Sequence, residues 1–187
     1  MVKSRTQVGI VGAGPAGLML GHLLHLAGVD SVILENRTRD YVVERVRAGV
    51  LEQGTVDLMH EAGVGDRLRK EGMRHEGIDI RFGGARHRID MAGLTGGRAI
   101  TIYGQNEVVK DLIAVRVASA RPLHFEVSDV SVQNLGTRAP VVRYQHEGVL
   151  HEVACDIIAG CDGSHGVCRT AVPPSHLQVF EREYPFA

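Results

Sequence analysis

Tryptophan is absent from this sequence, and only four tyrosines and four phenylalanines occur among its 187 residues. Proteins that bind single-stranded nucleic acid stack bases on such rings, so their scarcity makes a nucleic-acid partner unexpected. An excess of charge of either sign is also missing, because 21 Lys and Arg residues balance 22 Asp and Glu residues. A chain this close to neutrality carries no electrostatic footprint for nucleic acid or for a membrane surface.

Cysteine is scarce, with three residues in all: Cys155, Cys161 and Cys168. An odd number without a Cys-x-x-Cys pair predicts neither a disulfide framework nor a structural zinc site, and no metal ion is expected. Reduced thiols are typical of the cytoplasm, and we expect that location for the protein.

Long apolar runs are missing as well. Glycines, Pro15, His22 and His25 interrupt the most apolar stretch, residues 7–29, whereas a membrane helix needs about 20 apolar residues in a row. His22 and His25 lie one helical turn apart without a third ligand, so we interpret both as residues on a helix surface. With 44% hydrophobic and 23% charged residues, the composition predicts a soluble globular chain of one domain, or of one domain and part of a second.

A βαβ unit opens the chain. Residues 7–11 (QVGIV) are a short apolar run typical of a buried strand, and GAGPAG follows at Gly12–Gly17. Apolar residues then recur at helical spacing up to Gly28, and residues 31–34 (SVIL) form a second buried strand that ends before Glu35. Two buried strands joined by a helix predict a parallel sheet.

The glycine spacing suits a dinucleotide. Gly12 permits a tight turn, Gly14 lets the backbone approach a pyrophosphate at the positive end of the helix, and Gly17 lets the helix pack on the strand. Glu35 lies near the offset at which a carboxylate accepts hydrogen bonds from a ribose. Because a carboxylate repels a 2′-phosphate, the pattern predicts FAD or NAD at this site and argues against NADP.

The remaining pattern predicts an α/β fold: a Rossmann-like parallel sheet with a small antiparallel layer. After a polar loop at 36–50, we expect helices at 52–62 and 106–119 and a hairpin at 77–82 and 86–90. Asn106 is the expected N-cap of the second helix, whose inward positions are Val109, Leu112, Ile113 and Val117. We expect further strands at 99–103 and 156–159, an antiparallel layer at 123–127, 130–133, 141–145 and 149–154, and one more strand at 177–184.

Spacing alone leaves several charged groups with two interpretations. Arg45 and Arg47 suit phosphate oxygens, or simply a solvated loop. Asp162, before a glycine and after a buried strand, suits a ribose contact or an ordinary turn. His75 beside Glu76 suits a surface pair, although an imidazole titrates near neutral pH.

Five motifs occur together and in order: GAGPAG at 12–17, Glu35, RVRAGVLEQG at 45–54, YGQ at 103–105 and CDGSHG at 161–166. Along essentially its whole length the chain resembles the N-terminal half of the single-component flavin aromatic hydroxylases that act on 4-hydroxybenzoate. The run at 45–54 is the most specific of these motifs, since FAD- and NAD-binding Rossmann folds share the glycine motif.

The resemblance implies roles for residues that would hold FAD at its nucleotide end. The glycine motif at 12–17 and Glu35 would hold the ADP part of FAD. Arg45 and Arg47 would lie beside the cofactor phosphates, which favours the first of their two interpretations.

Other residues acquire roles nearer the reacting groups. By the resemblance, Gln105 would contact the flavin side of FAD, and Asp162 would hold the ribityl or pyrophosphate region. His165 and Arg169 belong to a stretch that would contact both FAD and the pyridine nucleotide. His75 would end a proton relay that ionises the substrate phenol.

The implied reaction is the hydroxylation of 4-hydroxybenzoate, a small phenolic acid, to 3,4-dihydroxybenzoate by a flavoprotein monooxygenase with FAD, O2, and NADPH or NADH. Asn36 stands where relatives often carry an arginine that helps select the 2′-phosphate of NADPH, so the choice of reductant is open. A homodimer is the expected assembly of the full-length form.

The family is about twice as long as this chain, so we expect a fragment that is inactive alone. Residues 1–176 would be the FAD-binding domain, with 73–104 contributing toward a substrate domain that begins at 177–187. Two alternatives stay open: an NAD-linked dehydrogenase with one Rossmann domain, and a non-catalytic module that binds FAD or another nucleotide.

Overall fold

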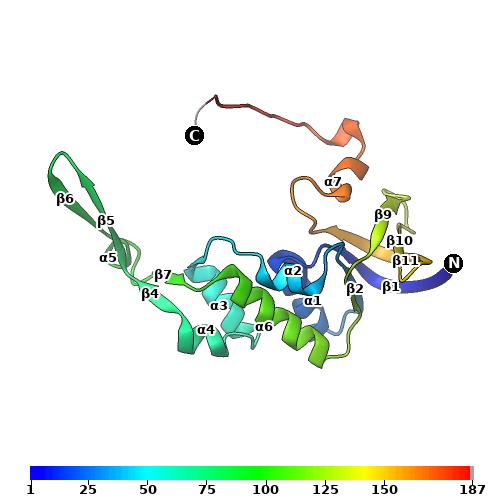
Figure 1. Ribbon diagram of the computed structural model, residues 1–187, viewed down its shortest axis with the longest axis horizontal. Coiled ribbons are helices and arrows are strands. Elements are labelled where there is room, and N and C mark those ends of the chain that lie inside the picture. Colours follow the sequence, from blue (N-terminus) through cyan, green and yellow to red (C-terminus); the bar gives the residue numbers. More distant parts are fainter. Residues whose placement is uncertain (186–187) are drawn as a thin grey trace.

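A six-stranded sheet forms the centre of the computed structural model, which describes residues 1–185 (Figure 1). Its strands are β1 (Val2–Val11), β2 (Ser31–Leu34), β8 (Leu123–His124), β9 (Ser128–Gln133), β10 (Val141–His146) and β11 (Val149–Gly160). Their order is β8-β2-β1-β11-β10-β9. The first four strands in this order are parallel, while β10 and β9 continue the sheet antiparallel, so the predicted fold class is confirmed.

The predicted βαβ unit is present. Helix α1 (Pro15–Leu26) joins β1 to β2 and begins with proline. The first N–H groups of a helix have no acceptor within the helix, so a residue without an N–H costs no hydrogen bond there. Gly28, just after the end of the helix, has a φ of +73°, a conformation that suits glycine. Ile10, Leu18 and Ile33 are fully buried where the helix packs on the two strands.

Strand β11 is longer than the pattern at 149–154 and 156–159 predicted, because the two pieces are one continuous strand. The expected break fell at Cys155, but Cys155 is buried and pairs with Thr6 of β1, while the next residue, Asp156, turns its carboxylate to solvent and accepts a hydrogen bond from Arg5 at 2.5 Å. β11 pairs with β1 from His151 to Gly160 and with β10 through its first half. The same strand therefore joins the antiparallel layer to the parallel sheet.

Strand β8 corrects a second expectation. The run at 123–127 was expected in the antiparallel layer, but only Leu123 and His124 form a strand, and it lies at the parallel edge beside β2. The chain then turns at Glu126, whose φ is +58°, and continues into β9.

Helix α6 (Gln105–Ala118) packs beside α1 on one face of the sheet. Val109, Leu112 and Ile113 are buried as predicted, but Val117 is 57% exposed and Arg116 is only 2% exposed. The guanidinium of Arg116 donates to the backbone carbonyls of Gly21, Ser31 and Pro122. Burial lowers the pKa of Arg116 to about 10, so the side chain stays charged at neutral pH and joins α1, β2 and α6.

Two further details differ from the sequence pattern. His22 is 8% exposed rather than on the surface, and its Nε2 lies 2.8 Å from the carbonyl oxygen of Ala62. The N-cap of α6 is Gly104 rather than Asn106, whose amide instead donates to the Glu107 carboxylate at 3.0 Å.

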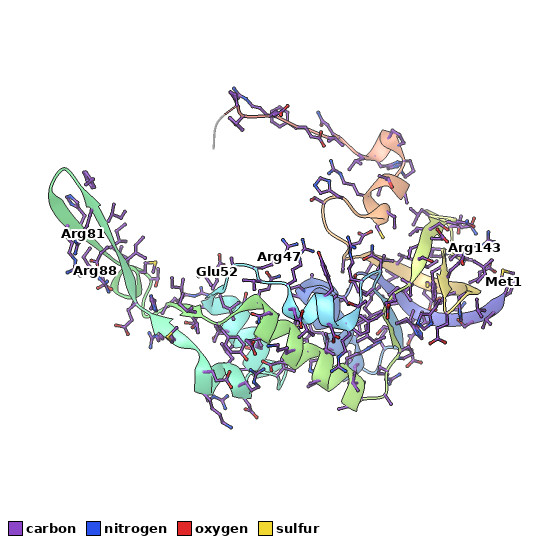
Figure 2. All side chains as sticks on the ribbon, viewed as in Figure 1. Met1, Arg47, Glu52, Arg81, Arg88 and Arg143 are labelled. Atoms are coloured by element: carbon purple, nitrogen blue, oxygen red, sulfur yellow. The ribbon has the colours of Figure 1, made fainter. Side chains whose placement is uncertain are left out.

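A second region is built from residues 50–102. It contains α3 (Gln53–Glu61), α4 (Asp66–Glu71) and an antiparallel sheet of β3 (Val50–Glu52), β7 (Ile100–Ile102) and β4 (Met73–His75), with β7 in the middle. The predicted hairpin is confirmed as β5 (Gly77–Phe82) and β6 (Ala85–Asp90), followed by α5 (Met91–Leu94). The hairpin projects from the molecule, and Figure 2 shows Arg81 and Arg88 on it, well away from the central sheet.

Short elements complete the chain. The loop predicted at 36–50 contains a helix, α2 (Arg39–Glu44), and another short helix, α7 (Val167–Ala171), follows the turn after β11. The strand predicted at 177–184 is absent, because no strand of the described residues pairs with this segment, which follows a 3-10 turn at Pro174–His176. No helix in residues 1–185 is both long enough and apolar enough to cross a bilayer.

Candidate nucleotide site

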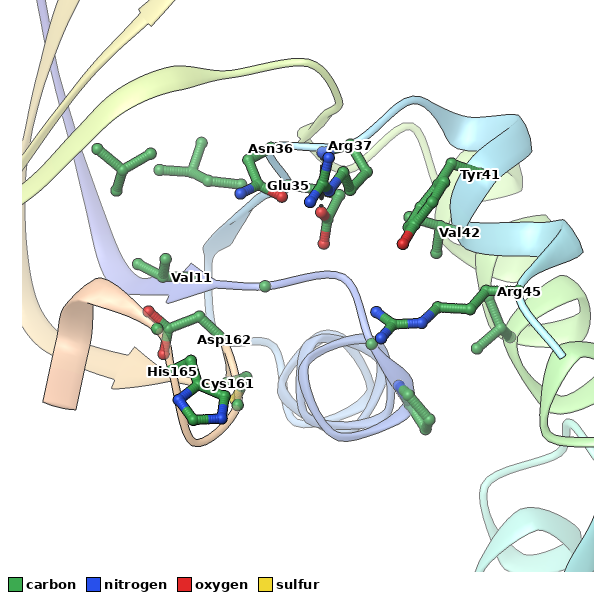
Figure 3. Close-up of a pocket in the computed structure, with 18 of the residues that line it drawn as sticks. Val11, Glu35, Asn36, Arg37, Tyr41, Val42, Arg45, Cys161, Asp162 and His165 are labelled. Carbon is green, nitrogen blue, oxygen red and sulfur yellow. Dashed lines mark hydrogen bonds between the residues drawn. The ribbon is translucent and has the colours of Figure 1, made fainter. Parts of the chain in front are cut away.

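A cavity of about 740 Å³ lies at the carboxyl ends of β1, β2 and β11. This edge of a parallel sheet is where α/β proteins bind ligands, because the loops after the strands diverge there. Figure 3 shows Glu35 and Arg45 on one side of the cavity and Asp162 and His165 across from them, with the N-terminus of α1 between. Eight of the predicted site residues line it: Gly12, Gly14, Glu35, Arg45, Arg47, Gln105, Asp162 and His165.

The glycine turn forms the floor of this cavity. Gly12 has a φ of +106°, and a Cβ there would lie 2.4 Å from the carbonyl oxygen of Cys161. A Cβ on Gly17 would lie 2.0 Å from the carbonyl oxygen of Gly12. Both positions therefore require glycine for the turn to pack between α1 and the end of β11.

Gly14 is different, because the protein itself does not crowd it. It is the N-cap of α1 and lines the cavity, and apart from its own neighbours in the sequence no atom lies within 4 Å of the place where its Cβ would stand. The free N–H groups and the positive dipole end of a 12-residue helix thus face open space. This is the arrangement in which helix N-termini bind phosphate.

Glu35 is held by two backbone N–H groups. Its Oε2 accepts from Ala13 N at 2.8 Å and its Oε1 accepts from Arg37 N at 2.9 Å. A carboxylate offers about four acceptor sites, so roughly two remain for hydroxyl groups of a ligand. The first of these bonds also ties the end of β2 to the glycine turn.

The segments that flank helix α2 supply cations to the same wall. The guanidinium groups of Arg37 and Arg45 lie 5.1 and 5.8 Å from the ring centre of Tyr41, so that the ring is flanked by two cations. Arg47 lines the cavity just beyond the helix. Three guanidinium groups beside a helix N-terminus give this wall a positive field that suits a pyrophosphate.

The opposite wall is built on the turn after β11. The Asp162 Oδ2 accepts from the backbone N–H of Cys168 at 2.9 Å, which leaves its other oxygen for a ligand. A Cβ on Gly166 would lie 2.0 Å from Asp162 Cγ, so a glycine is needed for this loop to fold over the carboxylate. His165 is exposed on the same loop and lines the cavity.

Gln105 lines the cavity as the first residue of α6, and a polar network holds that helix in place. The buried hydroxyl of Tyr103 donates to Asp111 Oδ2 at 2.7 Å, and Arg67 donates to Asp111 Oδ1 at 2.6 Å. Burial and the Asp111 carboxylate raise the pKa of Tyr103 above its usual range. The phenol therefore stays protonated and ties the middle of α6 to the residue that follows β7.

Three predicted site residues are not among those that line the cavity. Gly17 is one of them, because it packs beneath the turn against the Gly12 carbonyl. His75 is exposed on β4, opposite Ile100 of β7, and is not among the lining residues. Arg169 lines a neighbouring hollow of about 330 Å³ that shares Asp162 and Gly163 with the cavity. Its guanidinium donates to the Ser164 carbonyl at 3.0 Å, within the loop that carries His165.

The chain's thiols are not activated. Burial raises the pKa of Cys155 to about 11 and that of Cys168 to about 12, and burial followed by the Asp162 charge raises the pKa of Cys161. Because the thiolate is the nucleophilic form, these cysteines offer little nucleophile at neutral pH. Among residues 1–185 no group of three His, Cys, Asp or Glu side chains is arranged to hold a metal ion.

The sequence interpretation missed the lining role of Tyr41 and the side chains around it, since α2 itself was read as loop. The available signal was Thr38, whose Oγ1 accepts from Tyr41 N at 3.1 Å as an N-cap. Asn36 and Asn106 also line the cavity.

The family profile for the FAD binding domain matches residues 5–187. The chain belongs to the FAD-binding domain family. Over 186 residues it is 46% identical to the p-hydroxybenzoate hydroxylase of Acinetobacter baylyi, an alignment that covers 100% of this chain and 46% of that protein. The resemblance found in the sequence, and the expectation of FAD, are therefore confirmed, and the NAD-linked dehydrogenase is left without support.

Solved flavoenzymes share this fold. The p-nitrophenol 4-monooxygenase PnpA from Pseudomonas putida has a TM-score of 0.79 at 21% identity, covering 92% of this chain and 44% of its own. OxyS anhydrotetracycline hydroxylase from Streptomyces rimosus has a TM-score of 0.75 at 25% identity, covering 89% and 33%. The FAD-binding domain described here thus spans about half the length, or less, of these relatives.

The geometry of this FAD-binding domain fits the nucleotide end of FAD. The uncrowded Gly14 and the α1 N-terminus suit the pyrophosphate, and the two unused acceptor sites of Glu35 suit ribose hydroxyls. Arg45 and Arg47 add positive charge at the same wall. These groups come from three separate segments, and the parallel sheet brings them to one edge.

Proposed function

We propose that this chain is the FAD-binding half of an aromatic-ring monooxygenase that hydroxylates 4-hydroxybenzoate to 3,4-dihydroxybenzoate with O2 and NADPH or NADH. The observation that carries the proposal is the 46% identity to p-hydroxybenzoate hydroxylase along 100% of this chain. The relatives are about twice as long, so the activity is proposed for the longer protein and not for these 187 residues alone. We place that enzyme in the cytoplasm.

Binding is the task that the described residues perform in this proposal. The turn at Gly12, Gly14 and Gly17 receives the pyrophosphate, Glu35 accepts from the ribose, and the guanidinium groups of Arg45 and Arg47 neutralise phosphate charge. When bound, the flavin supplies the transfer of electrons from the reduced nicotinamide to O2 and the delivery of one oxygen atom to the aromatic ring.

The far side of the cavity serves the flavin end in this proposal. Gln105 at the start of α6 and Asp162 after β11 present polar groups to the ribityl chain and the ring. His165, on the loop that Arg169 braces through the Ser164 carbonyl, lies where both FAD and the nicotinamide nucleotide pass. We assign these four side chains to cofactor and reductant binding.

The substrate side of the proposal concerns residues 73–104. We assign residues 1–176 to the FAD-binding domain, with the hairpin and its sheet reaching into a substrate domain that begins at 177–187. Ile78, Ile80 and Phe82 lie on one face of the hairpin and are exposed, which suits a surface that packs on further chain. His75 at the base of this region is proposed to pass a proton from the substrate phenol to solvent.

Asn36 bears on the choice between NADPH and NADH. It is exposed at the rim of the cavity, next to Arg37, and it carries no charge to pair with a 2′-phosphate. We expect Asn36→Arg in the longer protein to raise the ratio of kcat/KM for NADPH over that for NADH. An unchanged ratio would contradict the role given to this loop.

The cofactor arm of the proposal is tested by titrating the purified chain with FAD and following flavin absorbance and fluorescence, with NAD as competitor. Tight binding that NAD does not displace is the expected result. Folded protein that binds NAD in preference to FAD would refute the proposal. The substrate arm is tested with the longer protein, in which 4-hydroxybenzoate should stimulate NAD(P)H oxidation and yield 3,4-dihydroxybenzoate in proportion to the O2 consumed.

A further inference from the structure

Three imidazole rings and one phenol ring meet where β8 approaches the antiparallel layer. The ring centres of His124 and His146 are 4.9 Å apart, and those of His146 and His151 are 6.2 Å apart. Tyr144 stacks on its cross-strand neighbour His151 at 5.0 Å with an interplanar angle of 7°. We call His124, His146, His151 and Tyr144 the histidine cluster.

The cluster draws its members from three strands of the central sheet. His124 lies on β8, Tyr144 and His146 lie on β10, and His151 lies on β11. The backbone carbonyl of His124 accepts a hydrogen bond from Glu35 N at 2.8 Å. Glu35, the proposed ribose-binding residue, is thus hydrogen-bonded through its backbone to one member of the cluster.

The electrostatic surroundings of the cluster contain little to offset positive charge. The carboxylate of Glu147, in the β10–β11 turn, raises the pKa of His124, whereas His146 and His151 lower it. Glu152 of β11 pairs with Lys3 of β1 and with Arg143 of β10, and Arg143 and Glu152 point to the other face of their strands. Burial, and then the neighbouring imidazoles, lower the pKa of His124 below its ordinary value.

We propose that the histidine cluster is a proton-sensitive contact that positions Glu35, so that protonation of the cluster loosens β8 from the antiparallel layer and weakens FAD binding. Two unit charges separated by 4.9 Å repel enough to change an equilibrium constant on the order of fourfold even at the dielectric constant of water. The coupling to FAD rests on the ribose role proposed for Glu35, whereas the effect on folding does not.

The direction of the pH effect follows from the lowered pKa of His124. The unfolded chain takes up a proton near pH 6.5, and the folded chain takes it up only at lower pH. The folded state is therefore most stable above about pH 6.5 and loses stability as the pH falls below that value. FAD affinity should fall over the same pH range if a displacement of His124 also displaces Glu35.

The test uses the double variant His146→Gln/His151→Gln, which removes two of the three imidazoles and leaves His124 in place. Thermal unfolding without FAD and FAD titration are each measured between pH 5.5 and 7.5, with EDTA present. In the unaltered chain we expect Tm to fall and the Kd for FAD to rise about fourfold or more toward pH 5.5. In the double variant the change in Kd should shrink to less than about twofold, and the Tm profile should become flatter, with the part due to burial of His124 remaining. His87→Gln is the control, because this exposed hairpin residue stacks on Phe82 away from the cluster.

Each outcome decides part of the proposal. Parallel pH profiles for the unaltered chain and the double variant, in both measurements, would overturn it. A flattened Tm profile with an unchanged pH dependence of Kd would overturn the coupling to Glu35. Absence of FAD binding at every pH would count against the proposed cofactor site instead, while the Tm profiles would still report on the cluster.

Discussion

Replacing Glu35 by glutamine separates the two tasks of this side chain. In the structure its two carboxylate oxygens each accept one backbone N–H, from Ala13 at 2.8 Å and from Arg37 at 2.9 Å. An amide keeps one acceptor oxygen and places an N–H₂ group where the second oxygen was. One backbone N–H therefore loses its acceptor, and the negative charge offered to the ribose is removed.

The expected losses differ for folding and for binding. A hydrogen bond to a charged group contributes about 1.5–3 kcal/mol, and partial exposure of Glu35 places the lost backbone bond at the lower end. We expect Tm to fall by about 3–6 °C, since about 1 kcal/mol shifts Tm by roughly 2–4 °C in a chain of this size. Loss of the charged acceptor should raise the Kd for FAD by about 10- to 100-fold.

Three ligands measured on the same protein test this reasoning. FAD and ADP both carry the ribose next to adenine, whereas FMN does not. Glu35→Gln should therefore weaken FAD and ADP by similar factors and leave FMN unchanged. If FMN weakens as much as FAD, the variant has damaged the fold of the site and the ribose contact is refuted. Unchanged affinity for ADP would refute it as well.

Other perturbations follow from the same structure. Gly17→Ala places a Cβ 2.0 Å from the Gly12 carbonyl oxygen, and we expect it to destabilise the fold by about 1–3 kcal/mol in urea unfolding and to abolish FAD binding. Gly14→Ala is its matched partner: with nothing within 4 Å of the new Cβ, Tm should barely change while FAD binding weakens, and a similar loss of Tm in both variants would contradict the argument. Arg116→Met removes the guanidinium donor from the carbonyls of Gly21, Ser31 and Pro122, and we expect the free energy of unfolding to fall by about 1.5–3 kcal/mol. An unchanged value would show that the guanidinium contributes nothing net. Cys155, Cys161 and Cys168 have raised pKa values, so a disulfide reagent at pH 7 should label them slowly in the folded chain and quickly in denaturant, and fast labelling when folded would contradict that environment.

Local sequence chemistry was enough to predict the elements that depend on near neighbours. The glycine turn at 12–17 and the Gly83-Gly84 hairpin need backbone conformations that few other residues adopt, so their positions in the sequence are informative. Glu35 and Asp162 could be placed together as well, because they lie one and two residues after buried parallel strands and such strands end at one edge.

Long-range contacts explain what the pattern missed. Periodicity places an arginine outside a helix, and only the three carbonyls contributed by distant segments make the interior favourable for Arg116. His22 is buried for the same reason, beside the Ala62 carbonyl. Residues 177–184 alternate as a strand would, but they form no strand, because no described strand lies beside them to pair with. Helix α2 is six residues long, which is too short for periodicity to reveal.

The pairing of β1 with β11 has a consequence for how the chain is made. Val8 of the first strand lies beside Ile157, so that one edge of β1 meets its partner only after about 150 further residues have been synthesised. At roughly 5–20 residues per second, a ribosome needs roughly 8–30 s to reach that point. During this interval β1 can pair with β2 alone, and its other edge is open to any strand that arrives. A nascent chain of this protein is therefore most vulnerable to misassociation just before residue 160 emerges, and slowing translation should lengthen that period of exposure.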